Sequence, residues 1–227
     1  LVPFSPEAPL SGVERTLGSD QFLWYRRSVI LPEGFVRDRT FLHFGAVDQE
    51  AAVFVNGRQL AHHIGGYLPF TCDVTDALQG GREMDIVVCV RDVTDESYHT
   101  RGKQRTARGG IWYTPQSGIW QTVWMESLPK THIRGLRITP LFDEAMVELR
   151  VQTSVPCACV ARLDGRTITF CSGTAVRVPM PGFHAWSPED PFLYDLQLEA
   201  GDDRVESYFA MRSFSVQTDA DGLPRLC

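Results

Sequence analysis

The 227-residue sequence lacks several features that would place it in a specialised class of protein. It has no apolar run near the roughly 18 residues that a membrane-spanning helix needs, so we expect no contact with a membrane. Acidic residues outnumber basic ones and the net charge is −6, which gives no support for nucleic-acid binding. The single asparagine, Asn56, is followed by glycine, so there is no N-glycosylation sequon.

The sequence also lacks any long stretch in which apolar residues recur every 3.6 positions. Apolar and polar residues alternate instead, most clearly in the segments 84–91, 146–155 and 192–199. Strands of this kind bury one face and wet the other, as in antiparallel sandwiches. Asn56-Gly57 follows an apolar segment and predicts a type I′ hairpin, because both residues tolerate positive φ. The predicted fold class is therefore all-β.

We expect two β-sandwiches. Residues 1–133 have long loops between strands, and a length of about 130 residues suits a jelly roll. Residues 134–218 contain roughly seven short strands, the size of an immunoglobulin-like sandwich. Residues 219–227 are interpreted as the start of a linker.

Cysteine and histidine are present without the spacing of a metal site. Four of the six cysteines lie in apparent strands among apolar residues, which predicts reduced, packed thiols rather than a disulfide framework. Cys157 and Cys159 have neither a Cys-x-x-Cys spacing nor a histidine partner set, so we expect no metal there. His62 and His63 are adjacent on a strand and should point to opposite faces. We expect a cytoplasmic location and leave a secreted or periplasmic one open.

Several tryptophans and tyrosines are expected to pack rather than bind. Trp120 and Trp124 have the same strand parity and should share one face. Trp186 and Tyr194 are expected to anchor the core of the second sandwich.

The segment from Asp92 to Ser117 has little strand pattern. Structureless loops longer than about 12–15 residues are uncommon and are usually functional or disordered. This segment mixes carboxylates and arginines, which suit sugar hydroxyls, with aromatic rings that suit the apolar side of a sugar ring. A solvated connection is the alternative that composition leaves open.

The order of several motifs resembles glycoside hydrolase family 2, the family of β-galactosidases and β-glucuronidases. The first part is similar to its N-terminal sugar-binding domain and the second to the immunoglobulin-like domain that follows. A small departure is Ala210, where the family usually has glycine. The motifs are Phe22-Leu23-Trp24-Tyr25-Arg26-Arg27, Leu42-His43-Phe44-Gly45-Ala46-Val47-Asp48, Val53-Phe54-Val55-Asn56-Gly57, Gly65-Gly66-Tyr67-Leu68-Pro69-Phe70, Val88-Cys89-Val90-Arg91-Asp92, Ser117-Gly118-Ile119-Trp120-Gln121 and Trp186-Ser187-Pro188-Glu189-Asp190-Pro191-Phe192-Leu193-Tyr194.

The resemblance implies the non-catalytic front part of a retaining glycosidase that acts on terminal β-galactosides, β-glucuronides or β-mannosides. Its expected partners are carbohydrate, a catalytic barrel that would follow in the same chain, and further copies in a homo-oligomer. Retaining glycosidases need two carboxyl groups about 5–5.5 Å apart. In this family both are barrel glutamates and the acid follows an asparagine, but no Asn-Glu pair occurs here. We therefore expect no catalytic residue among these 227.

The resemblance also implies a role for the long loop. In some family members, the loop after the Val-x-Val-x-Asp strand reaches the active-site mouth, where it contacts substrate or a cation. No cofactor is expected to be required, although a Na⁺, Mg²⁺ or Ca²⁺ ion in the intact enzyme is compatible with this loop. The candidate substrate-binding residues are Asp92, Asp95, His99, Trp112 and Tyr113.

The loop departs from the family pattern in being richly basic between Arg101 and Arg108, which would favour an anionic sugar or contact with the barrel. Two other functions remain open. One is a free-standing carbohydrate-binding module, and the other is a structural pair of sandwiches without a sugar site.

Overall fold

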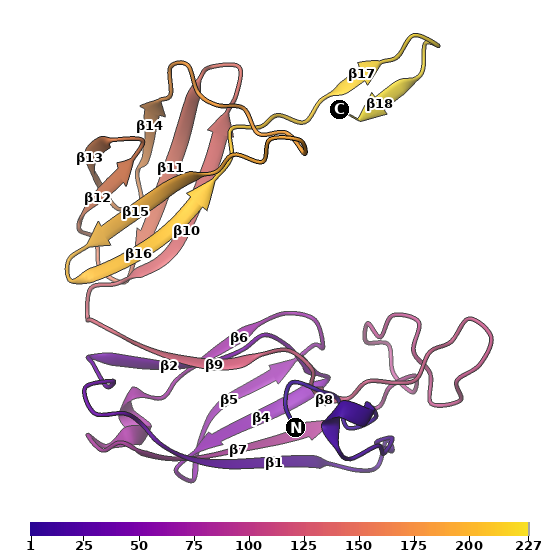
Figure 1. Cartoon of the computed structure of the whole chain (residues 1–227). Coiled ribbons are helices and arrows are strands. Elements are labelled where there is room, and N and C mark those ends of the chain that lie inside the picture. The colour runs from indigo at the N-terminus through magenta and orange to yellow at the C-terminus, as the bar shows by residue number, and fades with distance from the viewer. Residues whose placement is uncertain (227) are drawn as a thin grey trace. The chain divides into compact units, whose positions relative to one another are not determined.

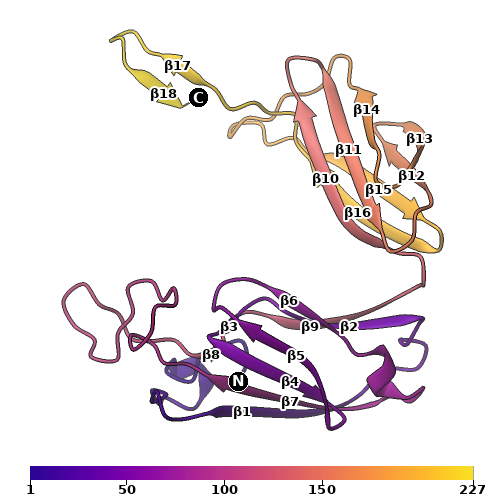
Figure 2. The ribbon, with the colours of Figure 1, turned by 180° about the vertical axis from the view of Figure 1, so that it is seen from behind.

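The structure is a computed structural model that describes residues 1–226 and contains two compact units, Leu1–Leu128 and Pro129–Cys227. Both units consist of antiparallel β-sheets, so the all-β prediction is confirmed (Figures 1 and 2). The boundary expected after residue 133 falls at the start of a strand, a few residues beyond the division between the units. The segment expected as a linker contains half of a small terminal hairpin.

Unit 1 contains nine strands and two short 3₁₀ helices. One sheet has the strand order β1-β7-β4-β5 and the other has the order β6-β2-β9, while β3 and β8 pair as a short ribbon. The elements are η1 (Pro9–Ser11), β1 (Leu23–Ile30), β2 (Arg39–Phe44), β3 (Val47–Asp48), β4 (Glu50–Val55), β5 (Arg58–Ile64), β6 (Phe70–Asp73), η2 (Thr75–Leu78), β7 (Glu83–Arg91), β8 (Gly118–Ile119) and β9 (Val123–Leu128).

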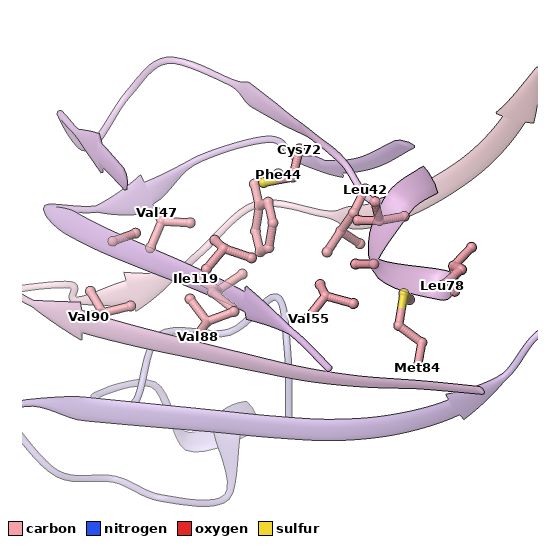
Figure 3. Close-up of a cluster of buried hydrophobic side chains, with 14 of the residues drawn as sticks. Leu42, Phe44, Val47, Val55, Cys72, Leu78, Met84, Val88, Val90 and Ile119 are labelled. Carbon is pink, nitrogen blue, oxygen red and sulfur yellow. The ribbon is translucent and has the colours of Figure 1, made fainter. Parts of the chain in front are cut away.

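Alternation along the strands builds the core of unit 1. In β7, Met84, Val88 and Val90 are buried, and in β2, Leu42 and Phe44 are buried. Figure 3 shows these side chains gathered with others between the two sheets. Each large apolar side chain that leaves water contributes about 1.5–3 kcal/mol, so this two-sided packing is what holds the sandwich together.

The hairpin between β4 and β5 confirms the prediction of a type I′ turn. Asn56 and Gly57 have φ of 49° and 76°, and Val55 pairs with Arg58. The Asn56 side chain also accepts a hydrogen bond from the Asp85 amide at 2.8 Å. The turn is therefore tied to β7 as well as to its own strands.

Unit 2 is a sandwich of seven strands with a terminal hairpin. One sheet has the order β10-β11-β14 and the other the order β13-β12-β15-β16, an immunoglobulin-like arrangement of three strands against four. The strands are β10 (Ile133–Leu141), β11 (Met146–Thr153), β12 (Ala158–Leu163), β13 (Arg166–Cys171), β14 (Ala175–Pro179), β15 (Tyr194–Ala200) and β16 (Asp203–Phe209), followed by β17 (Val216–Thr218) and β18 (Pro224–Leu226).

Of the two anchors expected in unit 2, one is confirmed and one is wrong. Tyr194 is buried in the core, and its hydroxyl accepts a hydrogen bond from the His184 amide at 2.6 Å. Trp186 lies outside that core and is only half-buried. Its ring covers the guanidinium of Arg212, whose central carbon lies 4.3 Å from the ring centroid. The segment around Trp186 is irregular, so strand alternation does not govern where its ring points.

The cysteines that the structure describes are not joined in disulfides. Cys72, Cys89, Cys157, Cys159 and Cys171 are free cysteines, whereas Cys227 lies outside the described residues. Within residues 1–226, no group of three or more His, Cys, Asp or Glu side chains is arranged to hold a metal ion.

His62 faces solvent beside Glu50, while His63 stacks on Phe70, which confirms that the two rings point to opposite faces. None of the helices in the described range is long and apolar enough to cross a membrane.

Candidate functional site

The candidate site lies at the end of unit 1 from which the long loop projects. The loop leaves the sheet after β7 and returns at β8, and both views show it extending beyond the sandwich (Figures 1 and 2). Two isolated bridges, Gln104 with Tyr113 and Gly109 with Trp112, give the loop its internal order. The loop thus carries side chains on a backbone that folds back on itself.

Asp92 closes the base of the loop. It is 2% exposed, and its Oδ1 accepts a hydrogen bond from the Thr94 amide at 2.7 Å. Its Oδ2 accepts a hydrogen bond from the hydroxyl of buried Ser117 at 2.8 Å. The Ser117 amide in turn donates to Glu7 Oε2 at 3.1 Å. The chemistry of Asp92 in this chain is therefore to join the two ends of the loop.

Asp48 pins the middle of the loop to the sandwich. It ends β3 and is 4% exposed. Gln104 Nε2 donates to its Oδ2 at 3.3 Å, while the Oε1 of the same glutamine accepts from the Gln116 amide at 2.6 Å. Burial and the neighbouring Asp92 raise the pKa of the Asp48 carboxyl to about 7. A carboxyl group that titrates near neutral pH thus sits beneath the loop.

Glycine and aromatic residues line the space around Asp48. A Cβ at Gly66 would lie 2.3 Å from Asp48 Oδ1, so only glycine fits there without a rearrangement. The Gly66 carbonyl accepts a hydrogen bond from Trp120 Nε1 at 2.8 Å. Tyr67 meets the Trp120 ring edge to face with 6.0 Å between centroids. Burial and Asp48 raise the pKa of the Tyr67 hydroxyl, so this phenol stays neutral and can donate a hydrogen bond.

Further out on the loop, Arg105 connects two of the predicted residues. Its guanidinium lies 4.0 Å from the Asp95 carboxylate, and its central carbon lies 4.1 Å from the centroid of Trp112. Asp95 also accepts hydrogen bonds from the Thr106 hydroxyl at 2.9 Å and amide at 3.3 Å, which lower the pKa of its carboxyl. We call Asp95, Arg105, Thr106 and Trp112 the Arg105 cluster.

The two remaining predicted residues lie outside the Arg105 cluster. His99 stacks on Tyr98 with 4.6 Å between centroids, and Tyr98 is 94% exposed. The Tyr113 ring is exposed, while its backbone pairs with Lys103 and Arg105. The structure therefore places Asp95 and Trp112 on the same arginine, Arg105, and Asp92 at the buried base of the loop. His99 and Tyr113 lie elsewhere on the loop.

The sequence did not identify Asp48, Gln104, Tyr67 or Glu7 as parts of this end of the molecule. Asp48 carried one signal, since it is an acidic residue at the end of an otherwise apolar segment. Trp120 and Trp124 do not share a face, because the chain is not a continuous strand between β8 and β9. Trp120 joins the Asp48 region, whereas Trp124 stacks on His43 at 3.7 Å.

Comparison with known proteins identifies the first unit. Residues 15–129 match the family model described as the sugar binding domain of glycosyl hydrolases family 2. The chain belongs to this family. The loop from Asp92 to Ser117 therefore lies inside the matched sugar-binding domain of family 2.

Relatives of known activity cover both units but are much longer. Human β-glucuronidase is 27% identical in an alignment 212 positions long, which covers 78% of this chain and 32% of the relative. A β-galactosidase from Thermoanaerobacter pseudethanolicus is 23% identical in an alignment 197 positions long, which covers 78% of this chain and 25% of the relative. The chain thus spans about a third or less of the length of these family 2 enzymes.

Solved structures show the same fold. β-Glucuronidase from Faecalibacterium prausnitzii superposes on 99% of this chain with a TM-score of 0.71 and 25% identity, using 42% of its own chain. β-Glucuronidase from Lactobacillus rhamnosus superposes on 99% of this chain with a TM-score of 0.73 and 25% identity, using 40% of its own chain. This family 2 chain therefore shares its fold with parts of these β-glucuronidases.

Proposed function

We propose that this chain forms the N-terminal, non-catalytic part of a retaining family 2 glycosidase that acts on terminal β-linked sugars. Its role is to support a catalytic barrel and to supply part of the substrate rim through the loop from Asp92 to Ser117. The proposal rests on the way this loop is fixed to the sandwich. Hydrogen bonds at Asp92 and Asp48 fix its base and its middle, and its outer part carries the Arg105 cluster.

The Arg105 cluster suits contact with a polar ring. A guanidinium held between a carboxylate and an indole is oriented before substrate arrives, which reduces the entropy lost on binding. Arginine pairs with carboxylates through two parallel hydrogen bonds. Among β-galactosides, β-glucuronides and β-mannosides, the basic loop favours β-glucuronides. The β-glucuronidases among the relatives support the same choice.

Asp92 and Asp95 have different roles in this proposal. Both carboxylate oxygens of Asp92 are engaged inside the protein, so Asp92 acts as a positioning residue. The Asp95 side chain is partly exposed and lies beside Arg105, so Asp95 is the carboxylate we expect near the sugar. The cation considered for this loop stays a prediction for the intact enzyme.

The test compares two proteins on a panel of nitrophenyl β-glycosides. Residues 1–227 alone should give no turnover, whereas the chain extended by whatever follows it in its gene should hydrolyse the β-glucuronide best. In the extended enzyme, Asp95→Ala should raise KM several-fold, and Glu96→Ala, an exposed neighbour, serves as the control. Turnover by residues 1–227, a gene that ends soon after them, or equal KM values for the two variants would contradict the proposal.

A carbohydrate-binding module without an attached barrel is the second candidate. It is supported by exposed aromatic side chains on the outer face of unit 1, among them Phe22 and Trp24, which are 58% and 62% exposed.

A further inference from the structure

The outer face of the sheet β1-β7-β4-β5 carries a row of four residues that crosses all its strands. Trp24 on β1 pairs with Cys89 on β7, Cys89 pairs with Ala52 on β4, and Ala52 pairs with His62 on β5. Adjacent strands lie about 4.8 Å apart, so the backbones of Trp24 and His62 are about 14 Å apart. Two small side chains therefore lie between a large aromatic ring and an imidazole.

A hollow lies over Cys89, Ala52 and His62 of this row, beside Trp24, and we call it the Trp24 trough. The hollow measures about 190 Å³ and is lined by Phe22, Glu50, Ala52, His62, Cys89 and Arg91. Pockets for drug-sized ligands are typically about 300–1,000 Å³, so the Trp24 trough suits a single small ring. Burial and the nearby Glu50 raise the pKa of Cys89, so its thiol is neutral and forms an uncharged floor.

Phe22 lines one end of the Trp24 trough, and Trp24 lies next to that lining, as the register partner of Cys89. Trp24 and Phe22 are two positions apart and expose 62% and 58% of their surface. Neighbouring exposed aromatic rings are informative, because single exposed apolar residues are common but clusters mark interaction sites. Their rings offer an apolar surface on which the C–H face of a sugar can lie.

Polar groups stand at the other end and along one side. His62 Nε2 lies 2.9 Å from Glu50 Oε1, and Glu50 pairs in register with Arg91 on β7. Arg91 is exposed and forms no ion pair with any residue from 1 to 226, so its guanidinium is available to a ligand. A carboxylate, an imidazole and a guanidinium in one rim can both donate to and accept from neighbouring hydroxyl groups.

We propose that the Trp24 trough binds one pyranose ring of a carbohydrate, at a site separate from the long loop. The ring stacks on the aromatic end, lies over Ala52 and Cys89, and directs two hydroxyl groups to the Glu50–His62 pair. Arg91 contacts a ring substituent at the open side. The small floor is what admits the ring, since a larger residue at either position would fill the hollow.

The experiment uses residues 1–227 and follows the indole N–H signals by nuclear magnetic resonance. The chain has five tryptophans, and the Trp24 signal is assigned by its loss in Trp24→Ala. Methyl β-pyranosides of galactose, mannose, glucose and glucuronic acid are titrated into the millimolar range. We expect a saturable shift of the Trp24 signal with at least one sugar. Preference for the glucuronide would assign its carboxylate to Arg91, and preference for a neutral sugar would assign a hydroxyl there; either supports the site.

Three variants distinguish the Trp24 trough from other surfaces. Trp24→Ala lacks the reporting indole signal, so its affinity is measured by isothermal titration calorimetry beside wild type, where it should bind roughly tenfold more weakly, which corresponds to about 1.4 kcal/mol. Ala52→Trp should abolish binding by filling the floor. Trp124→Ala is the matched control, because Trp124 is also exposed on unit 1 but belongs to the other sheet. Circular dichroism and thermal unfolding establish that each variant is folded.

The proposal is overturned if no pyranoside gives a saturable shift, if Trp124→Ala weakens binding as much as Trp24→Ala, or if Ala52→Trp leaves binding intact. A change of oligomeric state in Trp24→Ala without sugar binding would assign the face to a second copy of the chain instead. These outcomes are independent of the Asp95 and Arg105 loop variants, so failure here leaves the proposed function of the loop standing.

Discussion

Asp92 and Ser117, the first and last residues of the long loop of unit 1, are joined by a buried hydrogen bond of 2.8 Å. The bond brings the two ends of the loop together, so the intervening chain leaves and returns at one point of the sandwich. The closure entropy of a loop grows only slowly with its length. A single well-placed bond at the base can therefore hold a long insertion at modest cost, and the loop surface stays available for a ligand.

The first prediction concerns this bond. Asp92→Ala leaves the Thr94 amide and the Ser117 hydroxyl without their acceptor in a buried place. Leaving a buried donor unsatisfied costs about 1–3 kcal/mol. We expect Asp92→Ala to lower the free energy of unfolding by this amount in urea denaturation. The control Glu96→Ala, at an exposed position of the same loop, should change it by no more than about 0.5 kcal/mol. Equal stabilities for the two variants would refute the role of Asp92 as the closure of the loop.

The second prediction concerns pH. The folded protein raises the pKa of Asp48 to about 7, above the value of about 3.9 in an unfolded chain. The folded state therefore binds the proton more tightly than the unfolded state does. Its contribution to stability is fully present below about pH 4 and is lost as the pH rises towards 7. The expected loss is on the order of 4 kcal/mol, at roughly 1.4 kcal/mol per pKa unit.

Asp48→Asn isolates this effect, because the amide cannot ionise and its oxygen can still accept the bond from Gln104. The free energy of unfolding of wild type and of Asp48→Asn is measured at pH 4.5, 6 and 8. As the pH rises, wild type should lose stability relative to the variant. A difference that stays constant over this range would mean that Asp48 titrates normally.

The third prediction concerns the contact between Gly66 and Asp48. Gly66→Ala would place a Cβ 2.3 Å from Asp48 Oδ1, and overpacking of this kind costs about 1–3 kcal/mol. Gly135→Ala is the control, because its Cβ would meet its nearest neighbour at 3.5 Å, an ordinary contact. Combining Gly66→Ala with Asp48→Ala should restore part of the loss, since the clashing atom is removed. Strict additivity in this double-mutant cycle would show that the two residues do not interact.

The strands could be predicted from the sequence because each one carries its own signal. Alternation in β7 and β11 follows directly from burial of one face, and the Asn56-Gly57 turn depends on two adjacent residues with positive φ. These features are local, so the sequence contains all that determines them.

The surroundings of Asp48 could not be predicted, because they depend on residues far apart in the chain. Gly66, Asp92 and Gln104 approach Asp48 only when β3, the turn after β5 and the long loop meet at one end of the sandwich. Trp186 was misplaced for a related reason. It lies in an irregular segment, where neither period of side-chain orientation applies, and its ring lies over the guanidinium of Arg212.

The last prediction tests whether the long loop recognises an anionic sugar. Arg105 is held by Asp95 on one side and by the Trp112 ring on the other, so its guanidinium has little freedom to lose when it binds. In the glycosidase that we propose contains this chain, Arg105→Ala should lower kcat/KM for a β-glucuronide about tenfold, or roughly 1.4 kcal/mol. Hydrolysis of a β-galactoside should fall much less, because that sugar has no carboxylate. Arg58→Ala, on the exposed β4–β5 hairpin, is the control and should change neither rate. If Arg105→Ala lowers both rates equally, Arg105 shapes the loop but does not read the charge of the sugar.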